Sequence, residues 1–360
     1  MTDAIENNSY GREPNEGVVA LAEGQNIIKS SLFNLIVISH DPERAVHCQD
    51  LIRIIIEKFP CRIIFVRADP MAHSDFMRTT KSVQITGSGS NCVLCDQITI
   101  EASCNQFPKI PFLILPHIQP DLPIYILLGH TPEQDRAILP QIQRYASRVA
   151  FDPEVIENFA LFSQQILILL QNQSCDFIDM NWARTKAWRE VLASAFNTSE
   201  AIEQLKHSKT IQISYVCLPN QKKIQQEIQA IYIQAWLASR LNWNVISIER
   251  EENCIKIFYK YDHQSVTISL VPKDTGILQP GAIFSFEVLT EGDAHFLLSH
   301  ESDNKLVKVH ASNPERCEIP YTIFLSNYQN GPALVGEVFY QSKSDHYAEM
   351  LQLLSKTAVK

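Results

Sequence analysis

Glycine is scarce in this sequence, and none stands where a nucleotide-binding loop would require it. The chain contains 11 glycines among 360 residues. Its first strongly apolar segment, FNLIVIS, leads directly into His40-Asp41-Pro42-Glu43. A dinucleotide-binding domain uses glycines at this turn so that the backbone can approach a pyrophosphate. We therefore expect neither a nicotinamide nor a flavin enzyme of the usual kind, and we expect no cofactor.

The sequence also lacks an excess of positive charge and any long apolar run. Its net charge of -9 argues against a nucleic acid or an anionic membrane as partner, since both require a cationic surface. The apolar segment 159–170 is interrupted by Ser163, Gln164 and Gln165, so it is not expected to span a bilayer. Residues 1–16 have no basic region followed by an apolar one, which predicts a disordered tail and not a secretory signal. We expect a cytoplasmic protein.

Cysteines are present in an odd number, nine, dispersed along the chain. This usage fits a reducing compartment better than a disulfide scaffold. Cys92 and Cys95 have the spacing of half a zinc site or of a dithiol. No second such pair occurs, so we expect no metal, while a redox-responsive pair and ordinary strand cysteines both stay open. In a strand, residues three apart point to opposite faces, which disfavours a direct disulfide.

The first half of the chain predicts a mixed sheet covered by helices, resembling a Rossmann-like α/β domain without its glycine loop. A helix is expected over residues 17–30, and a second over 43–58 with Val46, Leu51, Ile54 and Ile55 on one face. Gly87-Ser88-Gly89 lacks the lysine and the following helix of a P-loop, and predicts the turn of a hairpin. The expected strands are FNLIVIS, CRIIFVRA, KSVQIT, CDQITIEAS, DLPIYILLG and SRVAFD, with a helix over residues 131–146.

The second half changes from helical to strand-rich patterns. Residues 153–206 predict helices that form a connector, and a strand over residues 210–217 and a long helix over 222–242 follow. Short alternating strands then predict an antiparallel meander, closed by a helix over residues 345–357. We therefore expect an α/β domain with a helical extension over residues 17–208 and an α+β domain over residues 209–360.

The stretch DMNWARTKAWREVLASAF, residues 179–196, combines two tryptophans with three cations. As a helix it places Ala187, Trp188, Val191, Leu192 and Ala195 on one apolar stripe. Trp182 lies near Lys186 and Arg189 and away from that stripe. Two explanations stay open for Trp182: stacking beneath its own cationic neighbours, or contact with a partner.

Several segments together resemble the glucose-6-phosphate dehydrogenase assembly protein family, OpcA. The resemblance covers residues 31–243 and includes FNLIVIS, DLPIYILLG, SRVAFDPE, DMNWARTKAWREVLASAFN and IQAWLASRLNW. The positions that match the family motifs are Asp121, Leu122, Pro123, Asp179, Trp182, Arg184, Trp188, Arg189, Trp236, Arg240 and Trp243. The chain departs from the family at Leu127 and Leu128, where aromatic residues are usual.

The resemblance implies a non-catalytic protein of the pentose phosphate pathway. Such a protein is an allosteric effector that binds glucose-6-phosphate dehydrogenase and favours its active oligomer. We expect contact with the dehydrogenase through Trp182, Arg184, Lys186 and Arg189.

No Gly-x-Ser-x-Gly or His-Glu-x-x-His motif occurs, and we assign no catalytic residue. The alternative is a sugar-phosphate-binding enzyme or sensor with a pocket between its domains, in which Arg184, Arg189 or Arg240 binds the phosphate. A weaker alternative is a glycan-binding surface on the C-terminal strands.

Overall fold

The computed structural model describes residues 26–69, 71–88, 91–171, 175–218, 225–252, 254–275, 278–301, 305–315, 317–326, 331–340 and 343–357. The chain divides into two compact units. Met1–Gly129 and Asp135–Ser147 form the first, and His130–Gln134 and Arg148–Lys360 form the second. The helical segment 159–206, which the sequence-based division joins to the first domain, groups with the second unit by its contacts. The predicted tail, residues 1–16, lies outside the described residues.

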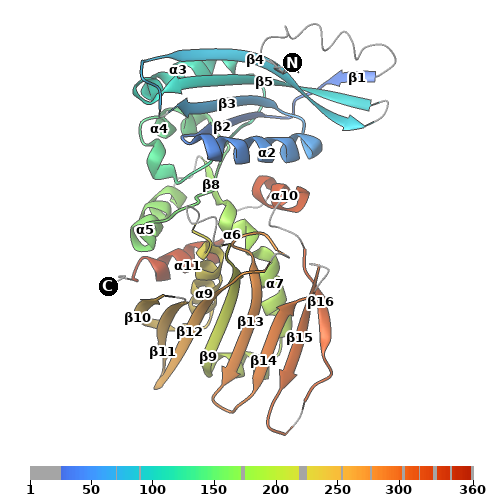
Figure 1. Cartoon of the computed structure of the whole chain (residues 1–360), viewed down its shortest axis with the longest axis vertical. Helices are drawn as coiled ribbons and strands as arrows, with labels where there is room; N and C mark the ends of the chain where they lie inside the picture. The colour runs from blue at the N-terminus through green and yellow to red at the C-terminus, as the bar shows by residue number, and fades with distance from the viewer. Residues whose placement is uncertain are drawn as a thin grey trace, which may run out of the picture. The chain divides into compact units, whose positions relative to one another are not determined.

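A mixed sheet forms the first unit (Figure 1). Its parallel neighbours are β5 (Asn91–Ser103), β3 (Arg62–Asp69), β2 (Asn34–Ser39) and β6 (Ile124–Leu128), with β1 (Asn26–Lys29) parallel to the start of β5. β4 (Met77–Ser88) pairs antiparallel with β5 along almost its whole length. This confirms the predicted hairpin, although Gly89 and Ser90 of its turn lie outside the described residues. All of β2 is buried, as expected for a central parallel strand with β-branched residues.

Helix α2 (Pro42–Lys58) follows β2 and packs on β2 and β3. The Asp41 carboxylate caps its start by accepting hydrogen bonds from the backbone N–H groups of Glu43 (2.8 Å) and Arg44 (3.1 Å). The predicted core position of Leu51 is confirmed, but that of Val46 is wrong because its side chain is 64% exposed. The two residues are five positions apart, which separates them by about 140° around the helix.

Two other predictions for the first half need correction, and one apolar run had no predicted structure. The expected helix over residues 17–30 is a strand where it is described, since Asn26–Lys29 forms β1. The apolar run after β5 forms the short helix α3 (Ile110–Ile114), between the 3-10 turns η1 (Cys104–Lys109) and η2 (Leu115–His117). The expected helix over residues 131–146 is broken into η3 (Pro132–Asp135), α4 (Leu139–Ile142) and η4 (Gln143–Tyr145). Pro140 lacks the N–H that a continuous helix would need.

The second unit contains a mixed sheet with strand order β10-β11-β12-β9-β13-β14-β15-β16. These strands are β9 (Ser208–Val216), β10 (Asn244–Glu251), β11 (Cys254–Tyr261), β12 (Gln264–Lys273), β13 (Ile283–Thr290), β14 (His295–His300), β15 (Leu306–Ser312) and β16 (Tyr321–Phe324). The strand β9 is parallel to β12 and antiparallel to β13. It therefore separates the expected meander into two antiparallel groups. A further parallel pair is formed by β7 (Arg148–Phe151) and β8 (Asp176–Asp179).

The helices of the second unit are α5 (Phe159–Leu170), α6 (Met180–Arg184), α7 (Lys186–Ala195), α8 (Ser199–Lys206), α9 (Ile228–Arg240), α10 (Pro332–Tyr340) and α11 (Asp345–Leu354). Figure 1 shows α7 and α9 beside this sheet. Helix α9 contacts β9 and β12, and α11 contacts α9 and α5. The long helix expected from residue 222 is described only from residue 225 and begins at Ile228. Among the described residues, no helix has the length and apolar character needed to cross a membrane.

The single helix expected over residues 179–196 is two helices, α6 and α7, which meet at Thr185. The Thr185 hydroxyl is buried and donates a hydrogen bond to the backbone carbonyl of Trp182 (2.7 Å). Residues 176–179, expected to be helical, form β8. The last residue of this strand, Asp179, is also the N-cap of α6, so the motif begins where a strand turns directly into a helix.

Candidate functional site

Asp179 is the centre of the hydrogen-bond network formed by the motif residues. Its carboxylate is 1% exposed. One oxygen accepts from the backbone N–H groups of Asn181 (2.8 Å) and Trp182 (3.2 Å), and the other from the hydroxyls of Tyr232 (2.7 Å) and Tyr347 (2.8 Å). Burial raises the pKa of Asp179 to about 6, although these hydrogen bonds act in the opposite direction. One carboxylate thus joins α6 to α9 and α11.

Trp182 lies in the core of the second unit. Its side chain is 6% exposed, and the Arg189 guanidinium stacks over it, 3.5 Å from the ring centroid. The ring of Tyr347 lies nearby, at a centroid distance of 5.3 Å. The sequence left open whether Trp182 stacks beneath its own cationic neighbours or contacts a partner, and the structure shows the stacking. The expectation that Trp182 lies away from the core is wrong, because α9 and α10 contact α6 and the Tyr347 ring of α11 lies against Trp182.

Arg184 is also buried, at 8% exposure. Its guanidinium donates to both carboxylate oxygens of Asp152, at 2.5 and 2.8 Å, and to the side-chain oxygen of Asn181 at 3.0 Å. Asn181 in turn donates to the backbone carbonyl of Pro153 (3.0 Å). This bidentate ion pair holds α6 against the segment that follows β7.

Lys186 and Arg189 are the predicted contact residues that remain partly accessible. The Lys186 ammonium contacts the Glu337 carboxylate of α10 at 2.6 Å, and 23% of its side chain is exposed. Burial lowers the pKa of Arg189 to about 10. Burial also raises the pKa of Glu337, while the hydrogen bond from Lys186 opposes that rise. Both cations are therefore engaged within the second unit.

The other motif residues of this unit are divided between core and surface. Trp188 is 2% exposed and donates its ring N–H to the Ile283 carbonyl (3.1 Å), and Trp243 is also 2% exposed. Trp236 is half-buried in α9. Arg240 is exposed and pairs with Glu349 at 2.9 Å. The structure does not gather these residues around one pocket; they fix the packing of α7, α9 and the sheet.

The Asp121-Leu122-Pro123 motif lies in the turn before β6. Buried Asn34 holds this turn by donating its side-chain amide to the carbonyls of Gln119 (2.9 Å) and Leu122 (3.2 Å). The backbone N–H of Asn34 also donates to the Pro123 carbonyl (2.8 Å). These contacts position the turn in the sheet and give it a structural explanation.

Cys92 and Cys95 both lie on β5 and are free thiols. Cys92 is half-buried and Cys95 is fully buried. Burial raises the pKa of the Cys95 thiol, which lowers the thiolate fraction needed for redox exchange. The redox role of this pair stays a prediction.

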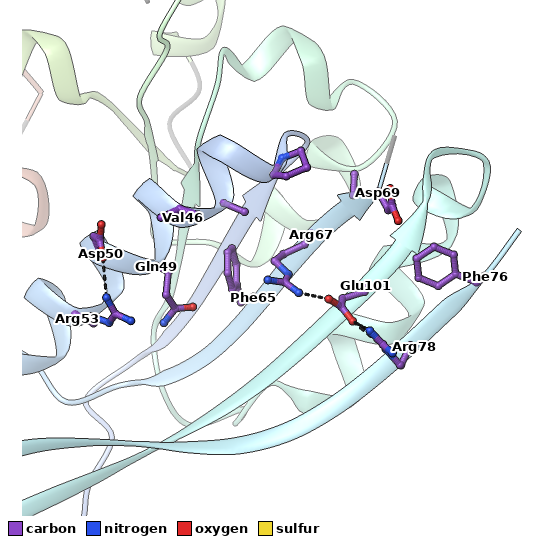
Figure 2. Close-up of a pocket in the computed structure, with 13 residues that line it drawn as sticks. Val46, Gln49, Asp50, Arg53, Phe65, Arg67, Asp69, Phe76, Arg78 and Glu101 are labelled. Atoms are coloured by element: carbon purple, nitrogen blue, oxygen red, sulfur yellow. Dashed lines mark hydrogen bonds and ion pairs between the residues drawn. The ribbon is translucent and has the colours of Figure 1, made fainter. Parts of the chain in front are cut away.

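A pocket in the first unit was not anticipated from the sequence. It has a volume of about 490 Å³ and lies between α2 and the strands β3, β5 and β4. Arg67, Glu101 and Arg78 form a row across three adjacent strands, with Glu101 contacting both guanidiniums (Figure 2). Burial raises the pKa of Glu101, but hydrogen bonds from Arg78 and Arg67 outweigh this effect and lower it. This neighbourhood could have been predicted from the sequence, because the register of the β4–β5 hairpin pairs Arg78 with Glu101.

These features define a two-unit, mixed α/β protein in which the motif residues Asp179, Trp182 and Arg184 are buried and the β2–α2 turn carries no glycine loop. The family model for the N-terminal domain of a glucose-6-phosphate dehydrogenase subunit matches residues 53–163, and the model for the C-terminal domain of that subunit matches residues 175–354. The chain belongs to the OpcA family of glucose-6-phosphate dehydrogenase assembly proteins.

Curated relatives carry the name "Putative OxPP cycle protein OpcA". The chain is 25% identical to that of Synechocystis sp. over 210 residues, which cover 55% of this chain and 40% of the relative. It is 24% identical to that of Synechococcus elongatus over 212 residues, which cover 56% of this chain and 44% of the relative. The matched region therefore spans less than half the length of these relatives.

Solved structures resemble the chain only distantly. An oxidoreductase from Bacillus cereus has a TM-score of 0.47 and 10% identity, covering 90% of this chain and 95% of its own. The transcriptional regulator Gal80p from Kluyveromyces lactis has a TM-score of 0.44 and 8% identity, covering 86% of this chain and 81% of its own. Similarities at this level do not bear on function.

Proposed function

We propose that this chain associates with glucose-6-phosphate dehydrogenase and acts as a non-catalytic effector that favours the active oligomer. The observation that carries the proposal is the match of two domain models of a dehydrogenase subunit, in order, to residues 53–163 and 175–354. A partner shifts an oligomeric equilibrium only if it binds one state more tightly than the other. The proposed role therefore requires a surface on this chain that distinguishes the two states of the dehydrogenase.

The accessible part of the motif region is the place where we propose that contact occurs. Trp182 and Arg184 are buried, so they support the surface by fixing α6 and do not form it. Lys186 and Arg189 reach the surface in part, beside the exposed Glu190. Glu190 is therefore the position at which a substitution perturbs this surface with the least effect on packing.

The test measures the rate of the cognate dehydrogenase against glucose 6-phosphate concentration, with and without an excess of this chain under reducing conditions. We expect a lower half-saturation concentration or a higher maximum rate, together with co-elution and a larger oligomer in sedimentation velocity. Glu190→Lys is expected to weaken the effect, while the matched charge reversal Glu349→Lys, on α11, leaves it unchanged. Identical rate curves combined with separate elution would refute the proposal.

The sugar-phosphate alternative receives no support from the arginines assigned to it. Arg184 is paired with Asp152, Arg189 is stacked on Trp182, and Arg240 is paired with Glu349 on the surface. We therefore retain the effector as the proposed function.

A further inference from the structure

A further pocket lies in the second unit, between the α7–α8 connection and the strands β14, β15 and β16. Its volume is about 420 Å³, within the range of small-molecule sites. The ring of Phe196, the residue that ends α7, lies 5.0 Å from the ring of Phe296 on β14. This contact holds the α7–α8 connection against the sheet beside the pocket. The residues that line the pocket belong to none of the family motifs.

The floor of the pocket is one face of three adjacent strands. Phe296 of β14 is paired with Ala311 of β15, and Val309 of β15 is paired with Tyr321 of β16. Val309 and Ala311 are two residues apart on one strand, so their side chains point to the same face of the sheet. Paired residues also share a face, so all four side chains are neighbours on one surface. Tyr321 is 43% exposed, which leaves its ring accessible to a ligand.

The wall on the helical side is polar and largely uncharged. It includes Ser194, Asn197, Thr198 and Gln204. The Thr198 hydroxyl caps α8 by accepting from the backbone N–H of Ala201 (3.1 Å). The side-chain amides of Asn197 and Gln204 can each donate and accept hydrogen bonds, and neither has a partner within the part of the chain that the structure describes. These two amides are therefore available to a ligand.

Carboxylates are the only charged groups among the described residues that line the pocket. They belong to Glu200 on α8 and to Glu318, which precedes β16, and both residues are exposed. Burial raises the pKa of the Tyr321 hydroxyl, and the nearby Glu318 carboxylate adds to the rise. A phosphate group would meet negative charge here, with no lysine or arginine among the described lining residues. The pocket therefore disfavours sugar phosphates and nucleotides.

An uncharged sugar ring has the same two kinds of surface as this pocket. Its C–H groups form an apolar face that suits the rings of Phe296 and Tyr321, and its hydroxyls both donate and accept hydrogen bonds, as the amides do. An ammonium group only donates, so it offers no acceptor to the amide N–H groups of Asn197 and Gln204. A nucleobase is apolar on both faces, whereas only the floor of this pocket is apolar. A hydroxylated ring therefore matches the floor and the wall together.

We propose that this pocket binds a short neutral saccharide, with one ring on Tyr321 and Phe296 and its hydroxyls bonded to Asn197 and Gln204. The glycan-binding alternative for the C-terminal strands thereby acquires a definite position, on the face of β14, β15 and β16 beside α8. The site goes beyond the association with the dehydrogenase, and its test does not require that partner.

The experiment is isothermal titration of the full chain at low ionic strength with glucose, maltose, cellobiose and sucrose. Glucose 6-phosphate, putrescine and adenosine are titrated for comparison. We expect a saturable site for at least one of the four saccharides. Glucose 6-phosphate should bind roughly tenfold more weakly than the tightest saccharide, because of the two carboxylates. Putrescine and adenosine should also bind more weakly than that saccharide.

Variants of the floor and of the wall locate the bound ring. Tyr321→Ala should weaken the tightest saccharide roughly tenfold, whereas Tyr321→Phe keeps the ring and should bind as the wild type does. Gln204→Ala should also weaken it roughly tenfold, since one hydrogen bond is lost. Phe324→Ala is the matched control, because Phe324 is an exposed aromatic residue of the same strand but lies three positions away, on the opposite face. Its affinity should not change.

Replacing both carboxylates, in a variant with Glu200→Gln and Glu318→Gln, tests why phosphate is disfavoured. Glucose 6-phosphate should then bind several-fold more tightly, while the affinity for the saccharide stays the same. Circular dichroism verifies that each variant is folded. The proposal would be overturned by no saturable binding of any saccharide, by tighter binding of glucose 6-phosphate, putrescine or adenosine, or by equal losses in Tyr321→Ala and Phe324→Ala.

Discussion

Replacing Asp179 by alanine tests whether the buried carboxylate carries a raised pKa. The substitution removes the N-cap of α6, which costs about 1 kcal/mol. It also leaves the hydroxyls of Tyr232 and Tyr347 buried without their acceptor, at about 2 kcal/mol each. Together these losses amount to about 5 kcal/mol of the free energy of unfolding.

The removed charge offsets part of this loss, and the offset depends on pH. The pKa of Asp179 rises from 3.8 to about 6 on folding. The folded state therefore has the full stabilisation from this carboxyl group below pH 3.8, where the group is protonated, and loses it as the pH rises through 6. The ionised group therefore opposes folding by about 3 kcal/mol at pH 7 and by about half that at pH 5. Asp179→Ala should destabilise the protein by about 2 kcal/mol at pH 7 but by about 3 kcal/mol at pH 5.

The assay is urea denaturation of the wild type and of Asp179→Ala at pH 5 and pH 7, monitored by tryptophan fluorescence and circular dichroism. Tyr347→Phe serves as control, because it keeps the ring against Trp182 and removes one hydrogen bond that lowers the pKa of Asp179. Its unfolding free energy should fall more steeply with rising pH than that of the wild type. A loss in Asp179→Ala that is equal at both pH values, or larger at pH 7, would refute the reasoning.

Other contacts give further predictions. Asp152→Ala and Arg184→Ala should each lower the unfolding free energy by about 3–5 kcal/mol, since each removes one partner of a buried ion pair. In urea titrations the double variant should lose less than the sum of the single losses, and additivity would contradict the pairing. Gly129→Ala would place a Cβ 2.9 Å from the buried Cys48 sulfur of α2, which should lower the free energy of unfolding by about 1–3 kcal/mol. Calorimetry should therefore show a lower thermal unfolding midpoint, and an unchanged midpoint would contradict the close approach. Alkylation at pH 8, followed by mass spectrometry, should modify exposed Cys104 at least tenfold faster than buried Cys95; equal rates would show that Cys95 is accessible.

Strong local patterns predicted the central elements of the fold. The β-branched runs indicated β2, β3 and β6, and the Asp41-Pro42 start signal indicated α2. The strands β1, β8 and β16 were missed; each has only four residues, a length at which periodicity seldom distinguishes a strand from a loop, although β7, of the same length, was predicted as part of SRVAFD. The position of β9 was also missed, since strand order depends on pairing between distant segments.

The residues of the motif were predicted, but their surroundings were not. Periodicity along α7 describes one packing face, whereas Trp182 is covered by segments much later in the chain. Tyr347 is 168 residues from Asp179, and Glu337 is 151 residues from Lys186. A cation beside a tryptophan has the same sequence pattern whether a distant segment of its own chain or another protein covers it. The pocket at Arg67 was missed for the same reason, because cross-strand register places its members together.

The central position of β9 also constrains how the second unit is made on the ribosome. Among the strands of its sheet, β9 is synthesised first, yet its partners β12 and β13 emerge only after α9, β10 and β11. Until then both of its hydrogen-bonding edges are unpaired, and such edges can pair with other chains. Sheet closure must bring together segments far apart in sequence, which slows folding. The nascent second unit thus passes through an aggregation-prone interval that ends only when β13 has left the exit tunnel.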